Sequence, residues 1–396
     1  MKKILFVDKS FAIGGIQTSM INMINTLVDY YEVHLYLYNP AGPLRNRLDD
    51  RVKIIEPTWR VQTMGMSFSE CMKIGTIKQK LFRLLATIWT KIFSNRIPIS
   101  IAFSHETIND EYDLAIAYHH EAEKKTLTSG FTRFIEKCVT SERRVSWIHN
   151  DCETNPIDEA FNDKYYQNVD KIICVSHIIK ENFIKNHPSV LRDKVDVCYN
   201  FLDYSTVEEL ANEQPDIMFD KRQFNCFSAC RLVPVKGFVR AIESIADILK
   251  KYNIAWYIAG DGSEKNNIST AIKENGLEKN VILLGALKNP YSYLAQADLL
   301  ILCSYFEAAP MLYSEGKYFK KPIFTTDISS SKEMLNNGEY GVICENSAEG
   351  IHKAFLELVE HREKLDLINQ NLSALKFDRR KSISEFEMAV FDNSSI

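Results

Sequence analysis

The chain has 396 residues, and its 48 Lys and Arg against 52 Asp and Glu give a net charge of −4. This length exceeds a single ordinary hydrophobic core and predicts two domains, while the near balance of charge gives no overall drive towards nucleic acid or another strong polyanion. The start, MKKILFVDK, lacks the apolar region of a signal peptide, and no run approaches about 18 consecutive apolar residues. We therefore expect neither a secretion signal nor a membrane-spanning helix.

Short apolar runs in the first half predict parallel strands covered on both faces. They lie at 3–8, 32–38, 112–118, 144–149 and 171–176. Continuous apolar runs are typical of parallel sheets, whereas strict alternation is typical of sheets with one solvated face. Helical patterns separate the runs, which favours a doubly wound α/β domain.

The first of these strands leads into a Gly-Gly turn. Gly14 and Gly15 precede a helical pattern with one broad apolar face, and glycines at this point let the backbone approach a ligand. The turn fits a phosphate or a purely structural role equally well. It is neither a Walker loop nor the dinucleotide fingerprint.

A basic amphipathic stretch interrupts the alternation of strands and helices. Residues 71–105 contain no acidic residue, whereas Lys73, Lys78, Lys80, Arg83, Lys91 and Arg96 are basic. Apolar residues recur at helical spacing between 81 and 93, so the stretch either lies on an anionic membrane surface or covers the N-terminal sheet with its apolar face.

Histidines follow two predicted strands of the first half. His149 and Asp151 follow 144–149 in SWIHND, and a histidine at a strand's carboxyl end can exchange a proton with a substrate. His119 and His120 sit after 112–118 without a comparable partner in the sequence, and we rank them second.

A polar, acidic stretch, 203–222, predicts a linker before a second α/β series. The strands of that series are expected at 224–230, 254–260, 280–285, 297–304, 321–327 and 340–346. Ligands of open α/β sheets bind outside the carboxyl ends of the strands. We therefore expect two doubly wound domains that face each other across a cleft.

Two cations follow the first strand of the second series. Arg231 stands at the strand end and Lys236 immediately before a helix, in RLVPVKGF. A planar guanidinium and a point-charge ammonium at one strand-to-helix turn suit a diphosphate, although a solvated loop would look the same.

Two glutamates bracket an apolar run in SYFEAAPMLYSEG. If Pro310 opens a helix, Glu307 lies in the loop and Glu315 in the second turn. One alternative is that the two glutamates form an acid/base pair, as in glycoside hydrolases. The other is that they accept hydrogen bonds from hydroxyls of a ligand whose phosphate binds to the amides of Met311 and Leu312. In a purely structural role, Glu315 pairs with Lys317, Lys320 or Lys321.

The nine cysteines predict neither a disulfide framework nor a metal site. They are scattered, odd in number and mostly within apolar strand-like runs, and no paired C-x-x-C, H-E-x-x-H or D-x-D occurs. We interpret them as reduced core residues of a cytosolic protein.

Taken together, these segments resemble the retaining glycosyltransferases of family 4, which have the GT-B fold of two Rossmann-like domains. The resemblance runs in order along most of the chain, through the segments Gly14–Gly15, 147–151, 173–183, 199–203, 231–238, 258–264, 283–290 and 297–316 and a close like YGVICEN. It implies an acceptor-binding domain at 1–203, a nucleotide-sugar-binding domain at 204–375 and a helix within 376–396 that returns to the first domain.

The resemblance also implies residue roles. Arg231 and Lys236 hold the donor diphosphate, Glu315 the ribose and Glu307 the donor sugar. The amides of Met311 and Leu312 face the phosphates, Leu287 lies by the nucleobase, Gly15 admits the diphosphate or acceptor, and His149 contacts the sugar near its reacting carbon. The expected donor is a nucleotide sugar, with UDP as the nucleotide, and neither a cofactor nor a metal is needed.

The chain departs from the family at both glutamates, because Ala308 and Ala309 stand where a glycine-containing stretch is common and Gly316 where alanine is usual. WIHND and EAAPMLYSEG are most similar to hexosyltransferases of bacterial capsule or exopolysaccharide clusters, which use lipid-linked acceptors. The resemblance thus implies a cytoplasmic enzyme, peripheral on the inner membrane face through 71–105. A GT-B nucleotide-sugar epimerase or hydrolase and a non-catalytic GT-B partner subunit stay open as alternatives.

Overall fold

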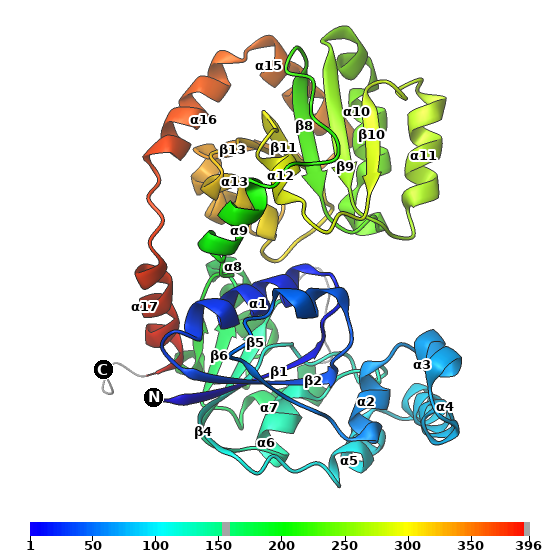
Figure 1. Cartoon of the computed structure of the whole chain (residues 1–396), viewed down its shortest axis with the longest axis vertical. Coiled ribbons are helices and arrows are strands. Elements are labelled where there is room, and N and C mark those ends of the chain that lie inside the picture. Colours follow the sequence, from blue (N-terminus) through cyan, green and yellow to red (C-terminus); the bar gives the residue numbers. More distant parts are fainter. Residues whose placement is uncertain (153–158, 392–396) are drawn as a thin grey trace. The chain divides into compact units, whose positions relative to one another are not determined.

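The computed structural model describes residues 1–152 and 159–391. Two compact units divide the chain, one formed by Met1–Phe201 with the segment that begins at Arg379, the other by Leu202–Asp378. Each unit contains one parallel sheet flanked by helices (Figure 1). The two doubly wound α/β units predicted from the apolar runs are thus confirmed.

The first unit has a seven-stranded sheet in the order β3-β2-β1-β4-β5-β6-β7. Its strands are β1 (Lys3–Ser10), β2 (Glu32–Asn39), β3 (Lys53–Ile55), β4 (Glu111–Ala117), β5 (Thr140–Ile148), β6 (Lys171–Cys174) and β7 (Val195–Val197). The runs predicted as strands become β1, β2, β4, β5 and β6, with small shifts at their ends.

Nine helices and two 3₁₀ turns within the described residues complete this unit. They are α1 (Gly15–Leu27), η1 (Pro43–Arg47), α2 (Trp59–Gly65), α3 (Phe68–Ile74), α4 (Ile77–Ile92), α5 (Arg96–Phe103), α6 (Phe131–Lys137), α7 (Glu159–Tyr166), α8 (His177–Asn186), η2 (Arg192–Lys194) and α17 (Arg379–Val390). The last, α17, packs on the first unit: Phe386 is fully buried, its ring lies beside Tyr31, and Arg379 donates to the Thr26 carbonyl at 3.0 Å.

The second unit has a six-stranded sheet in the order β10-β9-β8-β11-β12-β13. Its strands are β8 (Phe224–Ala229), β9 (Ile254–Ala259), β10 (Val281–Gly285), β11 (Leu299–Leu302), β12 (Ile323–Thr326) and β13 (Gly341–Cys344). Its other elements are α9 (Tyr204–Ala211), η3 (Pro234–Lys236), α10 (Phe238–Lys251), α11 (Lys265–Glu274), α12 (Tyr291–Leu294), α13 (Met311–Tyr318), α14 (Ser331–Met334), η4 (Asn336–Gly338), α15 (Ala348–Glu360) and α16 (Glu363–Ala374).

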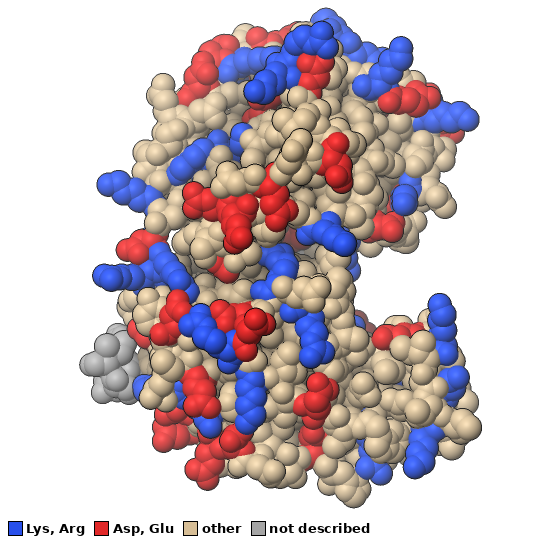
Figure 2. Space-filling view, viewed as in Figure 1, with Lys and Arg blue, Asp and Glu red and all other residues tan. Residues whose placement is uncertain are grey.

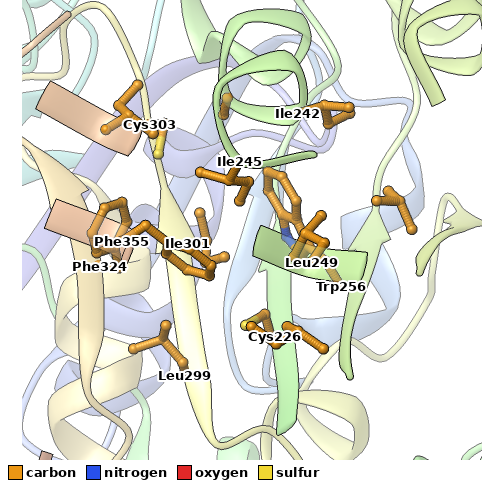
Figure 3. Packing of buried hydrophobic residues seen from close by; sticks show 14 of the residues in the cluster. Cys226, Ile242, Ile245, Leu249, Trp256, Leu299, Ile301, Cys303, Phe324 and Phe355 are labelled. Atoms are coloured by element: carbon orange, nitrogen blue, oxygen red, sulfur yellow. The ribbon is translucent and has the colours of Figure 1, made fainter. Parts of the chain in front are cut away.

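The core of the second unit lies between its sheet and the helices α10 and α15. Ile242, Ile245 and Leu249 of α10 pack over the strands, where they meet Trp256 and Phe355 (Figure 3). The Trp256 indole N–H donates to Ser228 Oγ at 2.9 Å, so even the polar atom of this buried ring is satisfied. The helix predicted after Lys236 thus forms as α10 and buries its apolar side chains against the sheet.

Residues 203–222, predicted as a linker, belong to the second unit. Asp203 caps α9 by accepting from Thr206 N–H, and Val207 of this helix is fully buried beside Tyr291 of α12. Phe219 stacks on Tyr257 of β9 at 3.8 Å. The prediction of a linker was wrong because single apolar residues, too widely spaced to form a periodic pattern, anchor this stretch.

Helix α4 presents its polar face to the protein and its apolar face outwards. The buried positions are Gln79, Arg83, Ala86 and Thr90. By contrast, Ile77, Leu81, Leu85 and Ile92 are 86%, 57%, 59% and 62% exposed. Arg83 donates to the carbonyls of Thr63 and Met64 in α2. The alternative in which the apolar face of 71–105 covers the sheet is therefore wrong for this helix.

Two of the remaining expectations concern cysteines and membrane spans. None of the nine cysteines, which all lie within the described residues, forms a disulfide, and all but the half-buried Cys230 are buried. No helix in the described part of the chain combines the length and hydrophobicity needed to cross a bilayer.

Candidate active site

The strand order of the second unit defines where its ligand site is expected. From β8, the next strands in sequence, β9 and β10, extend to one side, whereas β11, β12 and β13 extend to the other. Ligands of doubly wound sheets bind at the carboxyl edge beside such a reversal. The loops that follow β8 and β11 carry Arg231, Lys236 and Glu307.

Lys236 and Glu307 form an ion pair across this switch point. Lys236 Nζ donates to Glu307 Oε1, and Ser304 Oγ donates to the same oxygen at 2.9 Å. Their side chains are only 13% and 17% exposed. A partly buried ammonium has three donors, so Lys236 can hold Glu307 and still donate to an anion.

Arg231 supplies a second positive charge at the same loop. Its side chain is exposed and makes no hydrogen bond or ion pair within residues 1–152 and 159–391. Burial raises the pKa of the neighbouring Cys230 thiol to about 12, and Lys236, Glu307 and Arg231 all act on that thiol electrostatically. The three charged side chains are therefore grouped around the end of β8.

The loop that carries Lys236 is rigid for an identifiable reason. Gly237 adopts a left-handed conformation with φ 66°, and a Cβ there would lie 2.4 Å from the Cys303 carbonyl oxygen. Arg240 donates to that carbonyl and to Asn346 Oδ1, both at 2.9 Å, and its guanidinium lies over the Tyr305 ring. These contacts fasten the loops after β8, β11 and β13 to one another.

Helix α13 brings Glu315 and two free amides to this edge. Pro310 stands at the N-cap, so Glu307 lies in the preceding loop and Glu315 in the second turn, as predicted. The first N–H groups of a helix have no intrahelical carbonyl to bind, which leaves the amides of Met311 and Leu312 suited to an anion.

Glu315 is held inside the second unit. Only 9% of the residue is exposed, and Tyr291 OH donates to its Oε1 at 3.2 Å. Lys317 Nζ donates instead to the Met334 carbonyl, and Lys320 Nζ to the Leu375 carbonyl. Lys317 and Lys320 thus bond to backbone carbonyls rather than to Glu315.

The loops after β9 and β10 complete the edge. Gly260 has φ 145°, and a Cβ there would stand 1.9 Å from the Cys230 carbonyl oxygen. Its N–H donates to the Gly285 carbonyl at 2.7 Å, while Leu232 N–H donates to the Asp261 carbonyl at 2.9 Å. Half-buried Leu287 lies in the loop after β10 and packs against the core of the second unit.

In the first unit, Gly15 and His149 lie at the carboxyl edge of the sheet. Gly15 is exposed and begins α1 directly after the loop from β1. His149 follows β5, and its ring lies 4.7 Å from the Tyr118 ring. Burial, together with His120 and His119, lowers the pKa of His149 well below its usual value, so the imidazole is uncharged.

A hydrogen-bonded pair that sequence analysis missed, Asp8 and His119, lies at the same edge as His149. His119 Nδ1 is 3.0 Å from Asp8 Oδ1, which joins the loop after β4 to the end of β1. His119 was ranked second for want of a partner, and the contact with Asp8 corrects that ranking. The signal was present, since both residues end predicted strands, but only the strand order shows that β1 and β4 are neighbours.

No set of three or more His, Cys, Asp and Glu side chains among the described residues is arranged to hold a metal ion. The groups at the edge of the second unit are instead hydrogen-bond donors, namely two cations and backbone amides, together with two carboxylates that accept. This arrangement can bind a diphosphate and neighbouring hydroxyls.

Comparison with known proteins finds similarity to glycosyltransferases. Residues 211–373 match the family model of glycosyl transferases group 1. The chain is 24% identical over 388 residues to the N-acetylgalactosamine-N,N'-diacetylbacillosaminyl-diphospho-undecaprenol 4-alpha-N-acetylgalactosaminyltransferase of Campylobacter jejuni, covering 96% of this chain and 97% of the relative. An uncharacterized glycosyltransferase of Methanocaldococcus jannaschii is 26% identical over 239 residues, which cover 56% of this chain and little more than half, 58%, of the relative.

Solved structures share the fold over the whole chain. Anabaena HepE in complex with UDP and glucose aligns over 100% of both chains with a TM-score of 0.69 and 17% identity. The glycosyltransferase of Rickettsia africae aligns over 99% of this chain and 100% of its own with a TM-score of 0.65 and 16% identity. The chain therefore has the GT-B fold, and its residues 211–373 are similar to glycosyl transferases of group 1.

Proposed function

We propose that the protein is a glycosyltransferase that moves a hexosyl group from a nucleotide sugar to a glycan or lipid-linked acceptor. The observation that carries this proposal is the Lys236–Glu307 pair at the switch point between β8 and β11, within the segment that matches the glycosyl transferases group 1 model. The carboxyl edge of the second unit is then the donor site.

In this donor site the cations hold the diphosphate. Arg231, free and exposed, and Lys236, fixed against Glu307, donate to the phosphate oxygens, and the Met311 and Leu312 amides add two further donors. Glu315, buried beside Tyr291, accepts from the ribose hydroxyls, and Glu307 accepts from the sugar. Leu287 lies by the nucleobase, and UDP is the proposed nucleotide.

The proposed reaction retains the configuration of the sugar. The acceptor oxygen forms a bond to the anomeric carbon on the face from which the diphosphate departs, and the bonding pair leaves with the diphosphate. A phosphate oxygen takes the hydroxyl proton. Arg231, Lys236 and the helix amides stabilise the charge that develops on the leaving group, so no metal is needed for that task.

The first unit serves the acceptor in this proposal. Gly15 lets the acceptor or the diphosphate approach the start of α1, and uncharged His149 contacts the sugar near its reacting carbon. The Campylobacter jejuni relative acts, by its name, on a diphospho-undecaprenol substrate. We propose a lipid-linked acceptor for this chain too, in the synthesis of capsule, exopolysaccharide or a similar cell-surface glycan.

We further propose that α4 and its neighbours dock on an anionic membrane surface. The outward face of α4 carries Leu81, Leu85 and Ile88, and Trp89 packs on exposed Phe93 at 4.6 Å. Lys73, Lys78, Lys80 and Lys91 border this face, and Figure 2 shows basic side chains along the α3–α4 region. Apolar side chains with basic neighbours are the chemistry that anionic lipid binds. The acceptor lipid would then be presented to a cytoplasmic, peripheral enzyme.

A thermal-shift screen against nucleotide sugars tests the proposed function. A donor that binds the native state raises the melting temperature by mass action, so at least one UDP-sugar should raise it while the matching free sugar does not. Turnover of that donor only in the presence of a glycan acceptor separates a transferase from an epimerase or hydrolase. If no nucleotide or nucleotide sugar raises the melting temperature, the proposal is wrong.

A further inference from the structure

The first unit has a switch point of its own, and a hydrogen-bonded pair of a carboxylate and a histidine stands there too. Strands β2 and β3 extend from β1 to one side, whereas β4 to β7 extend to the other. Asp8 lies near the end of β1, and His119 follows the end of β4. The pair therefore occupies the place in this sheet where a ligand of a doubly wound domain is expected.

The geometry of the pair fixes how His119 presents its ring. Asp8 is fully buried, and its Oδ1 accepts from the Lys9 N–H at 2.6 Å and from His119 Nδ1 at 3.0 Å. Because Nδ1 donates to the carboxylate, Nε2 is the nitrogen left for a ligand, and in the unprotonated form of the ring it is an acceptor. His119 is 21% exposed, and its Nε2 has no hydrogen-bond partner within residues 1–152 and 159–391.

His119 differs from a histidine with a purely structural role. The buried His34 uses both ring nitrogens, with Nδ1 2.9 Å from Tyr112 OH and Nε2 3.0 Å from Glu32 Oε1. His119 uses one nitrogen inside the protein and leaves the other at the surface. Its ring is also held in place, stacked on His120 at 5.0 Å and tilted against Phe131 at 5.0 Å.

The backbone that carries His119 is anchored as well. Glu121, fully buried, accepts from Ser129 Oγ at 2.7 Å and from the amides of Gly130 and Thr132 at 2.8 and 3.0 Å. It also pairs with buried Arg133 at 3.3 Å. A buried carboxylate with this many donors ties the residues after β4 to the start of α6, so the position of His119 is fixed before any ligand binds.

The surrounding groups select a neutral donor as ligand. Burial lowers the pKa of His120 to about 3 and that of His149 well below its usual value, so both rings are uncharged. His149 Nε2 and Asp8 Oδ2 are buried without a partner among the described residues. This place thus offers acceptor atoms, whereas the corresponding place in the second unit offers the cations Arg231 and Lys236. Acceptor atoms match the O–H groups of a sugar rather than a phosphate.

We propose that His119, oriented by Asp8, binds a hydroxyl of the acceptor sugar through Nε2. Asp8 is then a positioning residue that fixes the ring and its tautomer. This inference rests on the proposed function, since it assigns the acceptor side of the same transfer, and it adds the chemical class that this side recognises: an uncharged sugar ring.

Three variants of the full-length chain test this inference. His119→Asn keeps a donor close to the position of Nδ1, and so keeps the bond to Asp8, but lacks the outer nitrogen. Asp8→Asn keeps the volume of the carboxyl group but loses its charge. His361→Asn is the matched control, because His361 is exposed in the second unit and pairs with Glu363.

The probes are the methyl glycosides of glucose, galactose, N-acetylglucosamine and N-acetylgalactosamine, followed by saturation-transfer NMR. At least one glycoside should bind the wild-type protein and His361→Asn with equal affinity. The same glycoside should bind His119→Asn at least tenfold more weakly, while the melting temperature and the UDP affinity of His119→Asn stay those of the wild type. Asp8→Asn should also weaken glycoside binding.

Two outcomes overturn the inference: no glycoside binds the wild-type protein, or His119→Asn binds the glycosides as the wild type does. UDP binding distinguishes the two proposals. If UDP binds and the glycosides fail, only the acceptor site is wrong, whereas failure of UDP and every nucleotide sugar to bind removes the proposed function itself.

Discussion

At the scale of single residues, the first unit keeps two histidines uncharged at its ligand edge. Burial is the main cause, and for both His120 and His149 the neighbouring histidines lower the pKa further. An unfolded histidine takes up a proton near pH 6.5, whereas His120 in the folded chain does so only near pH 3. Between these values the unfolded state binds more protons than the folded state.

This difference predicts how stability depends on pH. Where the unfolded state binds more protons, the free energy of unfolding rises with pH, so it should fall as the pH drops from 7 to 5. His120 should account for on the order of 1–2 kcal/mol of that loss at pH 5. Melting curves of the wild type and His120→Asn between pH 7.5 and 5 measure it. The variant should lose less stability than the wild type, and equal losses would contradict the assignment.

Residue types in the second unit were predictable, but their pairing was not. Lys236 and Glu307 were each predicted as ligand contacts, and the structure adds that they bind each other. Their separation of 71 residues in the sequence hides this contact until the order β8-β11 is known. Asp8 and His119, 111 residues apart, were missed for the same reason.

At the scale of elements, α13 follows the sequence closely. Pro310 predicts the start of a helix with Glu307 before it and Glu315 in its second turn, and α13 begins at Met311 directly after Pro310. The departure at Gly316 has a packing reason, because a Cβ there would lie 2.8 Å from Ile323 Cδ1 and 3.0 Å from Leu300 Cδ1. Gly316 thus allows α13 to lie close to β11 and β12.

Helix α4 shows what periodicity leaves open. The spacing of apolar residues predicts an amphipathic helix and was right about that, but periodicity does not tell which face meets the protein. The deciding residues are polar: Arg83 reaches the carbonyls at the end of α2, and Gln79 Nε2 donates to Gln62 Oε1 at 3.3 Å. Hydrogen bonds of this kind depend on the tertiary structure.

The exposed face of α4 predicts binding to anionic vesicles. In a flotation assay, the wild type should rise with vesicles containing phosphatidylglycerol and much less with phosphatidylcholine alone. Leu81→Gln combined with Leu85→Gln should abolish flotation by removing two outward apolar side chains. Leu367→Gln is the matched control, since Leu367 is 61% exposed in the second unit. The docking face would be refuted if the double variant floated as well as the wild type, or if the wild type did not float at all.

At the scale of the whole molecule, the long apolar runs were enough to predict two doubly wound sheets. The strands that were missed, β3 and β7, have three residues each and lie at the edges of their sheet. A run this short has no period to detect. Each sheet has a switch point with a carboxylate and a basic side chain across it, Asp8 and His119 in the first unit, Glu307 and Lys236 in the second. In the proposed reaction, the first pair serves the acceptor and the second the donor.

The proposed function requires that the Lys236 edge of the second unit bind the donor diphosphate. Calorimetric titration of the wild type, Lys236→Ala and Lys332→Ala with the nucleotide sugar that gives the largest thermal shift tests it most directly. Lys332 is the matched control, an exposed lysine of the same unit paired with Asp327. A charge-assisted hydrogen bond contributes about 1.5–3 kcal/mol, so Lys236→Ala should bind the donor roughly 10- to 100-fold more weakly while Lys332→Ala binds like the wild type. Unchanged donor affinity in a folded Lys236→Ala protein would contradict the claim.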